Sequence, residues 1–297
     1  MEVIPLAPSL GAEIRDLALG RASDAEIDRV KELLFEHLVL FFPEQHLSVD
    51  EHVGFARHFG PLEAHPNLDS PECDVPEIFE LMATHGGVAD EWHSDITFRD
   101  EPSIFAILNM VKCPAVGGDT MWANMYKAYD ELSPPLRDLC DGLTALHDAH
   151  PHGHPDQMAI HPVVRVHPVT GKKSLFVNEH FTRRIVEMSH EESDMLLGHL
   201  TRWATNPRFT VRYHWTKGTI AIWDNRCTQH FVLNDFDEER VIQRATVMGD
   251  QPEPAAPPRW PAWVSGGFTG AMGRHDRQLN RQLRRQTRDL ESNAKKS

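Results

Sequence analysis

The chain reads FTVRYHW at residues 209–215, TKG at 216–218, TIAIW at 219–223 and RVIQRATVM at 240–248. The three longer runs are rich in β-branched and aromatic residues, which is typical of strands. The short run that contains Gly218 is typical of a turn, and it predicts a hairpin between the first two strands. This part of the sequence therefore indicates a fold built mainly from short strands.

The same pattern of short strand-like runs separated by turns recurs along the chain. A turn at Pro168-Val169-Thr170-Gly171 predicts a second hairpin. The further runs of strand length are Val39–Phe42, Ile78–Met82, Ile104–Val111, Val163–Val166 and Leu175–Val177.

Helices are predicted mainly early and in the middle of the chain. Capping boxes at Ser23-x-x-Glu26, Ser48-x-x-Glu51 and Ser189-x-x-Glu192 each precede apolar residues at helical spacing. A fourth helical segment, 123–146, is interrupted by Ser133-Pro134-Pro135. Strands and helices do not alternate, which disfavours a Rossmann sheet. We therefore expect a mostly β fold with flanking helices, of the double-stranded β-helix (jelly-roll) type.

The charge balance limits the partners. The 297 residues carry a formal net charge of −14. Residues 274–297 hold eight Arg or Lys against three Asp or Glu, a net of +5, which leaves −19 on residues 1–273. So acidic a body repels phosphate backbones, and we expect no nucleic-acid partner.

No membrane association is expected either. The densest apolar run, LVLFF at 38–42, is far shorter than the ~20 residues that a spanning helix needs. The start of the chain lacks a basic region followed by a long apolar stretch, so no secretion signal is predicted. The four cysteines have no close pairs and are expected to be reduced thiols in the cytoplasm.

The C-terminal region differs from the rest in composition. We expect a domain at 1–250, followed at 251–297 by a proline-rich strap and a basic tail. Leu279, Leu283 and Leu290 would share one side of a helix among arginines. This tail is either solvated or docked on an acidic body, its own or a neighbour's, where it would help to hold a homo-oligomer (a dimer or tetramer).

Histidine is over-represented, with 19 residues, and three side chains form a candidate metal site. In an extended chain His93 and Asp95 point to the same face. His230, which follows the strand TIAIW and a polar turn, is a candidate third ligand. On these residues alone His93 and Asp95 could equally be a surface or structural pair, and His230 a solvated loop histidine. Two histidines and one carboxylate are the ligands of non-haem Fe(II) oxygenases, although His and Asp also bind zinc.

Two arginines follow the candidate metal site. Arg240 and Arg244 lie on the same face of their predicted strand. Either both face water, or they face inward, in which case the pair needs anionic partners. In addition, Thr120 comes directly after a Gly117-Gly118-Asp119 turn that leads into a strand.

Five segments together resemble the iron(II)/2-oxoglutarate-dependent dioxygenases of the taurine and 2,4-dichlorophenoxyacetate dioxygenase family. The resemblance extends from about residue 3 to residue 250, in order and with similar spacings. The segments are WHSDITF (92–98), GGDTMW (117–122), HPVVRVHPVTGKKSLFVNEHFTRRI (161–185), IWDNRCTQH (222–230) and RVIQRATVMGD (240–250).

The resemblance implies specific roles. It implies that Fe(II) is bound by His93, Asp95 and His230. It implies that Thr120 and Arg240 hold 2-oxoglutarate by its distal carboxylate and that Arg244 lines the same pocket near the anionic end of the substrate. The other implied pocket residues are His65, the backbone of Ile96, Phe181 and Trp223. The implied reaction uses dioxygen to hydroxylate a C–H bond of a small anionic organic substrate and releases succinate and CO2.

Departures from the family pattern bear on the substrate. Leu68 and Ala89 replace a tyrosine and an asparagine that contact the amino end of taurine. The segment between His230 and Arg240 is one residue shorter than usual, and the histidine-rich segment 147–161 is also shortened. We interpret 147–161 as a polar loop over the pocket, with a second metal site as the alternative. A sulfonate, sulfate ester or carboxylate with an apolar tail longer than that of taurine is therefore expected.

Two other classes of function remain open on the sequence. One is a zinc-dependent hydrolase, and the other is a non-catalytic small-molecule-binding protein on the same barrel. A ketoacid pocket made by Arg240 and Thr120 argues against the first, and a complete set of metal ligands argues against the second.

Overall fold

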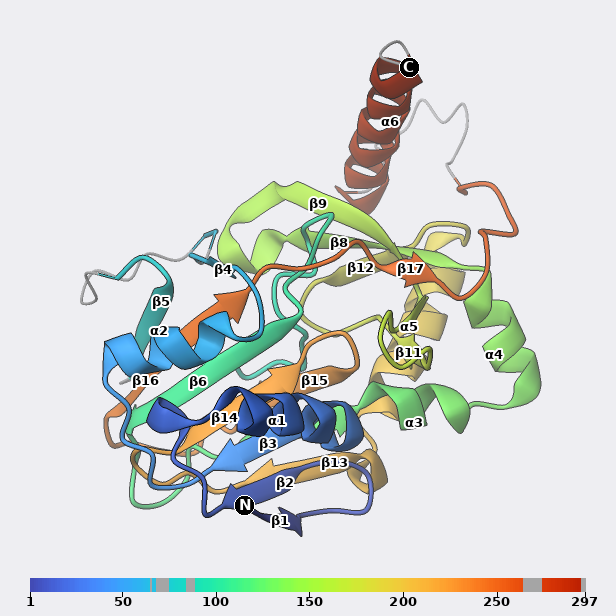
Figure 1. Cartoon of the computed structure of the whole chain (residues 1–297). Helices are drawn as coiled ribbons and strands as arrows, with labels where there is room; N and C mark the ends of the chain where they lie inside the picture. Colours follow the sequence, from blue (N-terminus) through green and yellow to red (C-terminus); the bar gives the residue numbers. More distant parts are fainter. Residues whose placement is uncertain (65, 68–74, 84–88, 264–273, 295–297) are drawn as a thin grey trace.

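The computed structural model describes residues 1–64, 66–67, 75–83, 89–263 and 274–294 (Figure 1). Its largest unit is an eight-stranded sheet in which β5 (Ile78–Ala83) also pairs with β16. The strand order is β1 (Glu2–Pro5), β2 (Ala12–Arg15), β3 (Val39–Phe42), β14 (Ile220–Asp224), β6 (Phe105–Lys112), β16 (Arg240–Val247) and β4 (Leu62–Glu63).

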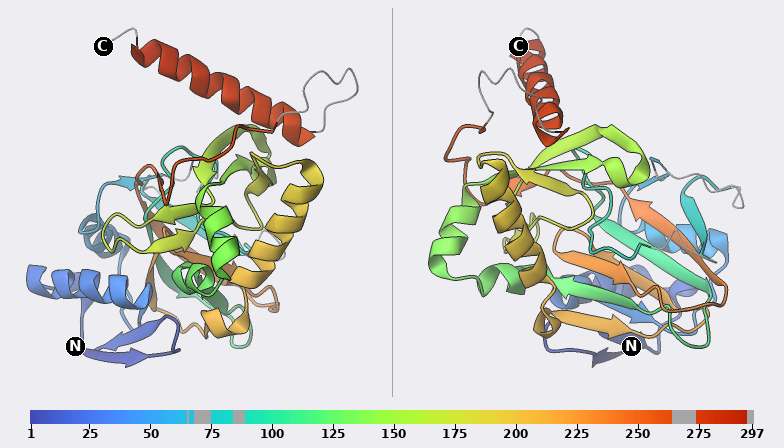
Figure 2. Two further views of the ribbon diagram at one scale, coloured as in Figure 1. Left: turned by 90° about the vertical axis from the view of Figure 1, so that its right-hand side faces the viewer. Right: turned by 180° about the vertical axis from the view of Figure 1, so that it is seen from behind.

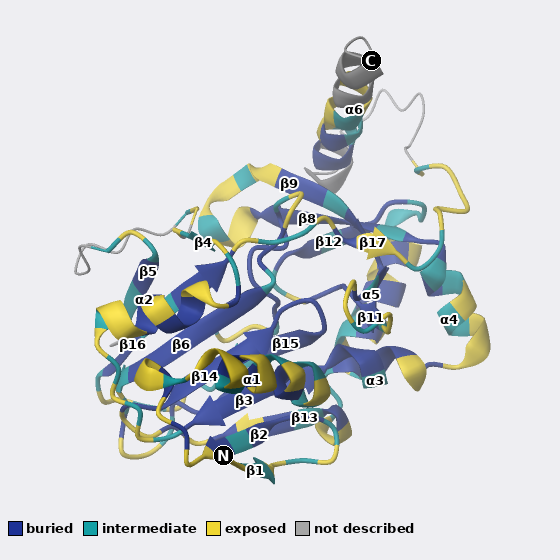
Figure 3. Cartoon of the chain, viewed as in Figure 1, coloured by how far each residue is buried: buried dark blue, intermediate teal, exposed yellow. Residues whose placement is uncertain are grey.

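Both faces of this sheet are buried at its centre (Figure 3). Leu40 and Phe42 pack into a core with residues of α1 (Asp24–His37) and α2 (Val49–Arg57), which cover one face (Figure 1). Val39 and Phe41, which alternate with them, pack on the other face with Trp122 and Trp223. The coverage of both faces explains why VLFF is a continuous apolar run.

Three smaller sheets complete the body. The first contains β13 (Thr210–Tyr213), β7 (Thr120–Asn124) and β15 (Thr228–Val232). The second contains β12 (Thr182–Ile185), β8 (Thr144–Ala149) and β9 (His154–Pro162). The third contains β11 (Lys173–Leu175), β10 (Val164–Val166) and β17 (Glu253–Pro254).

Among the described residues, the other helices that precede the C-terminal tail lie beside these sheets. They are α3 (Met125–Asp130), α4 (Pro134–Asp141), α5 (His190–Ala204) and three short 3₁₀ turns, η1 (Leu19–Arg21), η2 (His150–His152) and η3 (Pro207–Phe209). All three predicted capping boxes are present, at Ser23, Ser48 and Ser189, and each closes with the expected glutamate. The predicted break at Ser133 also separates α3 from α4. However, residues 144–146, expected in this helical segment, are the start of β8.

One predicted hairpin is confirmed and one is wrong. β10 and β11 form an antiparallel pair across Pro168–Gly171, although β11 begins two residues before the predicted strand 175–177. In contrast, β13 and β14 do not pair across 216–218. β13 pairs with β7, whereas β14 lies between β3 and β6 in the main sheet. The turn therefore carries the chain from one sheet to another.

The histidine-rich segment 147–161 was expected to be a loop, but it forms most of a β-hairpin. β8 and β9 pair with a register shift between Asp148 and Ala149, and η2 forms the tip. His147 and His161 are buried within the pair, and their rings bond to Thr97 Oγ1 and to the Thr97 and Arg99 carbonyls, respectively. Only the tip reaches the pocket described below.

The basic tail forms α6 (Arg274–Ala294), which packs on β9 (Figures 1 and 2). Leu279 is fully buried in a cluster with Leu146, Met158 and Val186. Gln278 Nε2 donates to Asp148 Oδ2 at 2.5 Å. The first part of α6 thus packs on the rest of the same chain and is not a solvated tail.

Arginines of α6 also contact acidic groups of the body. Arg281 pairs with Asp156, and Arg285 lies 3.2 Å from Asp100. The C-terminal end of the helix stands clear of the rest of the chain (Figures 1 and 2). Across the described residues, every helix is too short or too polar to cross a bilayer.

Candidate active site

His93 and His230 face each other across an isolated antiparallel bridge. The His93 amide donates to the His230 carbonyl at 3.1 Å, and the His230 amide donates back at 2.8 Å. His230 belongs to β15, which is held in register by β7. Opposed residues of an antiparallel pair project to the same side, and the two ring centroids are 4.0 Å apart.

Asp95 completes the cluster from the turn that follows His93. Its Oδ1 lies 3.9 Å from Nε2 of His93 and 3.9 Å from Nε2 of His230. The three ligand atoms lie within 4.8 Å of one another, and all three residues are buried. This spacing leaves room for one ion at the centre of the three atoms.

The protonation states of the histidines suit a metal. Nδ1 of His93 donates to the Glu91 carbonyl at 2.7 Å, which leaves the Nε2 lone pair directed at the cluster. Burial lowers the pKa of His93 well below its usual value and that of His230 to about 4. Both rings are therefore neutral at pH 7, the form that ligates metals. The donor set fits Fe(II) bound by two histidines and one carboxylate.

A second cluster, His167, Asp224 and Cys227, is equally compact but is already satisfied internally. His167 Nε2 bonds Asp224 Oδ2 at 2.9 Å, while its Nδ1 accepts two backbone amides. Arg226 donates twice to the same carboxylate, at 2.9 and 2.7 Å. Burial raises the pKa of the Cys227 thiol well above its usual value. These contacts make the cluster a structural network.

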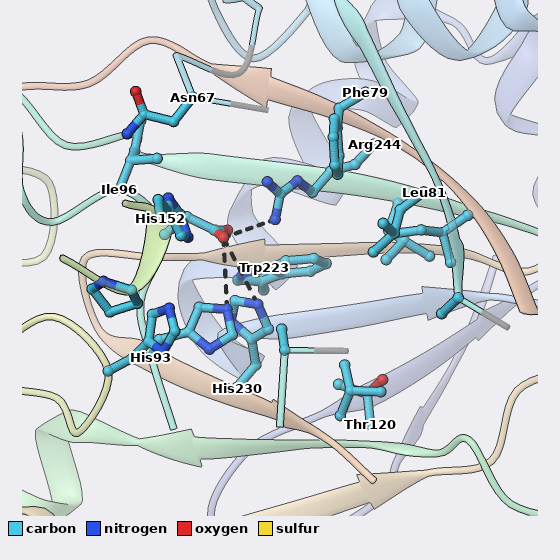
Figure 4. A pocket seen from close by; sticks show the side chains of 18 of the residues that line it. Asn67, Phe79, Leu81, His93, Ile96, Thr120, His152, Trp223, His230 and Arg244 are labelled. Carbon is cyan, nitrogen blue, oxygen red and sulfur yellow. Dashed lines mark hydrogen bonds and ion pairs between the residues drawn. The ribbon is translucent and has the colours of Figure 1, made fainter. Parts of the chain in front are cut away.

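A cavity of about 520 Å³ lies beside the three candidate ligands (Figure 4). Its polar lining includes Thr120, Arg240 and Arg244. Its apolar lining includes Phe79, Leu81, Leu108, Phe181, Trp223, Val232 and Ile242. Small-molecule sites commonly combine a mostly apolar wall with a few polar groups in this way.

Arg240 is buried in the cavity wall close to Thr120. Its Nη2 lies 3.5 Å from Thr120 Oγ1, and its Nε donates to the Gly118 carbonyl at 3.2 Å. No carboxylate among the described residues pairs with it, and burial lowers its pKa to about 10. A buried cation without an acidic partner is costly, so the site fits an anionic ligand. The shortened segment before Arg240 does not prevent this approach to Thr120.

Arg244 occupies a different part of the wall. Its Nη1 donates to Asp95 Oδ1 at 2.8 Å, and the guanidinium lies 5.6 Å from the centre of the Phe79 ring. Its Nε is buried without a hydrogen-bond partner among the described residues. The two arginines line the one pocket that they were expected to share, but at separate points. Arg240 lies beside Thr120, and Arg244 lies beside the candidate metal ligands.

The other predicted pocket residues divide into two groups. Ile96, Ala89, Phe181 and Trp223 line the cavity as expected. Ile96 has a φ of +45°, a conformation that is strained for a β-branched residue and that recurs at functional sites. His65 and Leu68 lie outside the described residues, so their predicted contacts remain predictions.

Sequence reasoning missed several lining residues. Phe79 and Leu81 belong to a strand that was predicted without a role in the site. His152 and His180 also line the cavity. The only signal for His152 was its place in the histidine-rich segment, and no local signal indicated which of those histidines would face inward.

Comparisons with known proteins show the family to which the chain is related. The family model "Taurine catabolism dioxygenase TauD, TfdA family" matches residues 2–246. The chain is 37% identical over 274 residues to an alkylsulfatase of Acinetobacter baylyi, covering 84% of this chain and 86% of that one. It is also 37% identical over 276 residues to an alpha-ketoglutarate-dependent sulfate ester dioxygenase of Pseudomonas putida, covering 85% and 91%.

Solved structures are similar as well. A taurine dioxygenase from Burkholderia xenovorans is 36% identical, with a TM-score of 0.77, 84% of this chain and 92% of that chain being covered. AAD-2 in complex with Mn(II) and N-oxalylglycine is 28% identical, with a TM-score of 0.73 and coverage of 84% and 98%.

Proposed function

The chain belongs to the taurine catabolism dioxygenase TauD, TfdA family, and from this premise we propose that it oxidises a C–H bond of a small anionic organic substrate. It is an oxidoreductase that requires Fe(II), 2-oxoglutarate and dioxygen. The observation that carries the proposal is the convergence of His93, Asp95 and His230 on one point in a cavity that also holds Arg240. The zinc hydrolase and the non-catalytic binding protein are not favoured.

The metal ligands have distinct tasks in this proposal. The Glu91 carbonyl orients the His93 ring, and the backbone bridge orients that of His230. Asp95 would supply the carboxylate ligand. Bound Fe(II), with 2-oxoglutarate and dioxygen, supplies the oxidising power that converts C–H to C–OH, with release of succinate and CO2.

The remaining side chains bind and orient. Arg240 and Thr120 hold 2-oxoglutarate by its distal carboxylate, because they form a buried cationic and hydroxyl pair at one end of the cavity. Arg244 faces the anionic head of the substrate near the metal ligands, together with His65 and the backbone of Ile96. Phe181, Ala89 and Trp223, which line the cavity, surround the organic body and keep water from it. Leu68, outside the described residues, stays a predicted substrate contact.

We favour an alkyl sulfate ester or a sulfonate longer than taurine as substrate. Two of the relatives act, by name, on sulfate esters or alkyl sulfates. The apolar walls built by Phe79, Leu81 and Ile242 suit a hydrocarbon chain. Hydroxylation of the carbon that bears the sulfate oxygen gives a product that can break down to an aldehyde and sulfate.

Four broader proposals accompany this function. The eight-stranded sheet and the β13-β7-β15 sheet are the two halves of a jelly roll, with the metal site between them. The free thiols of Cys113, Cys140 and Cys227 suit a cytoplasmic location. A homo-oligomer, dimer or tetramer, stays a prediction, as does the division into a domain at 1–250 and a strap and tail at 251–297.

The experiment is a succinate-release assay with Fe(II), 2-oxoglutarate and a panel of anions. The panel contains taurine, hexanesulfonate, hexyl sulfate, an aryloxyacetate and hexanoate. We expect hexyl sulfate or hexanesulfonate to give succinate in a 1:1 ratio with aldehyde. If taurine were the best-coupled substrate, the proposed substrate class would be wrong. If no anion stimulated succinate release, the proposed reaction would be wrong.

A further inference from the structure

His152 lies at the tip of the β8–β9 hairpin and lines the same cavity as Arg244 (Figure 4). It comes from a part of the chain remote from both the metal ligands and the arginines. Arg244 and Asp95 line this cavity together with His152. The hairpin thus brings a polar ring to the end of the cavity where we place the anionic head group.

The tip that carries His152 is held firmly. Asp148 Oδ1 accepts the His150 amide at 3.1 Å and Arg183 Nε at 2.8 Å. Gly153, with a φ of +76°, closes the turn, and its amide donates to the His150 carbonyl at 3.0 Å. From outside, Gln278 of α6 donates to the other oxygen of Asp148. A side chain on such a support is preorganised, which lowers the entropic cost of ligand binding.

The imidazole ring itself is packed among other rings. Its centroid lies 5.7 Å from that of Phe98 and 5.3 Å from that of Phe181, at interplanar angles of 81° and 87°. His180 lies 5.7 Å away, and its Nδ1 is bonded to Glu91 Oε2 at 2.6 Å. Burial, the first cause, and the neighbouring His180 and Arg244 lower the pKa of His152 to about 4. At pH 7 the ring is therefore neutral and carries one N–H.

The anionic head needs such a donor. One Nη of Arg244 is already bonded to Asp95, so the guanidinium cannot offer all its N–H groups to a head group with three oxygens. Resting on the proposed function, we propose that His152 is a substrate-binding residue that donates its imidazole N–H to the anionic head, beside Arg244. It thereby favours oxyanion heads over neutral ones of the same length.

The test uses variants that separate the donor from the packing. His152→Phe keeps an aromatic ring against Phe98 and Phe181 but removes the N–H. His152→Gln restores an N–H donor. His154→Phe, at an exposed position outside the cavity, is the matched control. For each protein we would measure kcat and the KM values for hexyl sulfate and for 2-oxoglutarate. Calorimetry without oxygen gives the Kd of hexyl sulfate for the Fe(II)- and 2-oxoglutarate-loaded protein.

We expect His152→Phe to raise the Kd and KM for hexyl sulfate about tenfold, the effect of losing a hydrogen bond to a charged group. The KM for 2-oxoglutarate should stay within about twofold of the wild-type value, a contrast that a purely structural role would not produce. His152→Gln should recover most of the affinity, and His154→Phe should match wild type.

Two results would overturn the proposed role of His152 and leave the proposed function intact. One is unchanged hexyl sulfate binding in His152→Phe, and the other is an equal rise in the KM for both ligands. Wild-type protein that binds no anion of the panel would instead overturn the proposed substrate class, and the role of His152 with it.

Discussion

Arg244 donates a 2.8 Å hydrogen bond to Asp95 Oδ1, the carboxylate oxygen that faces both His93 and His230. The guanidinium therefore neutralises a buried carboxylate at the point where the metal would bind. Arg240, only four residues away on β16, makes no such contact and instead approaches Thr120. One strand thus presents two cations to two ends of the cavity, and this arrangement predicts different effects when each is removed.

Arg240→Ala should raise the KM for 2-oxoglutarate by about 10- to 100-fold, because a charge-assisted hydrogen bond in a closed pocket is worth about 1.5–3 kcal/mol. Arg244→Ala should act mainly on the KM for the anionic substrate. Arg57→Ala, at an exposed position on α2, is the control and should change neither. Steady-state kinetics with each ligand varied in turn would check this. A larger effect on 2-oxoglutarate in Arg244→Ala would mean that the two roles are reversed.

His93→Ala and His230→Ala should each weaken Fe(II) binding by more than tenfold and abolish turnover. The bridge between the two residues is made by backbone atoms, which the substitutions keep, so cooperative thermal unfolding should be retained. Anaerobic calorimetry with Fe(II), together with circular dichroism, measures both properties. Wild-type activity in either variant would contradict the ligand assignment.

His52 should make the folded state less stable as the pH falls. It is fully buried in α2, its Nε2 lies 3.0 Å from the Ile107 carbonyl, and burial lowers its pKa from 6.5 to about 4. Between these values the unfolded chain binds a proton that the folded chain does not, so stability is full above pH 6.5 and declines toward pH 4. The shift corresponds to about 3 kcal/mol at most.

Urea unfolding of the metal-free protein at a series of pH values would measure this. His52→Gln, which keeps an N–H for the Ile107 carbonyl, should flatten the pH dependence. His199→Gln, at an exposed position on α5, should leave it unchanged. Identical slopes for His52→Gln and wild type would show that His52 does not titrate as the structure predicts.

Leu279→Ala should lower the free energy of unfolding by about 3 kcal/mol if α6 docks on β9 in solution, since the leucine is fully buried. Met195→Ala, at a side chain that is 72% exposed on α5, should cost almost nothing. Urea unfolding compares the two. Equal effects would mean that α6 does not stay docked. Light scattering of a chain truncated after Met272 would show separately whether α6 contributes to an oligomer.

Local pattern suggested part of the site, and the resemblance to the family assigned the roles of its residues. His93 and Asp95 were placed together by the two-residue spacing, and Arg240 and Arg244 by their position on one strand. His230 was predicted to follow the strand TIAIW and a polar turn, and it lies in β15, directly after the turn at 225–227. The strand TQHFV was not predicted, although Thr, Phe and Val favour strands, and its pairing with β7 sets its register.

Other features depend on contacts between distant segments. The residues at 216–218 favour a turn whether the two flanking strands pair or enter different sheets. The sequence therefore could not distinguish these cases, and the hairpin predicted for β13 and β14 was wrong. The inward position of His152 depends on the register shift of β8 against β9 and on Asp148, which is fixed by Arg183 and Gln278. Local periodicity does not encode either relationship.

The most direct test of the account is the visible spectrum of the protein mixed with Fe(II) and 2-oxoglutarate without oxygen. Wild-type protein should develop a weak charge-transfer band at one iron per chain, because His93, Asp95 and His230 hold the ion with positions left for the keto acid. Arg240→Ala should need more 2-oxoglutarate to develop the same band. Iron shown to be bound at this site, with no band at saturating 2-oxoglutarate, would contradict the central claim.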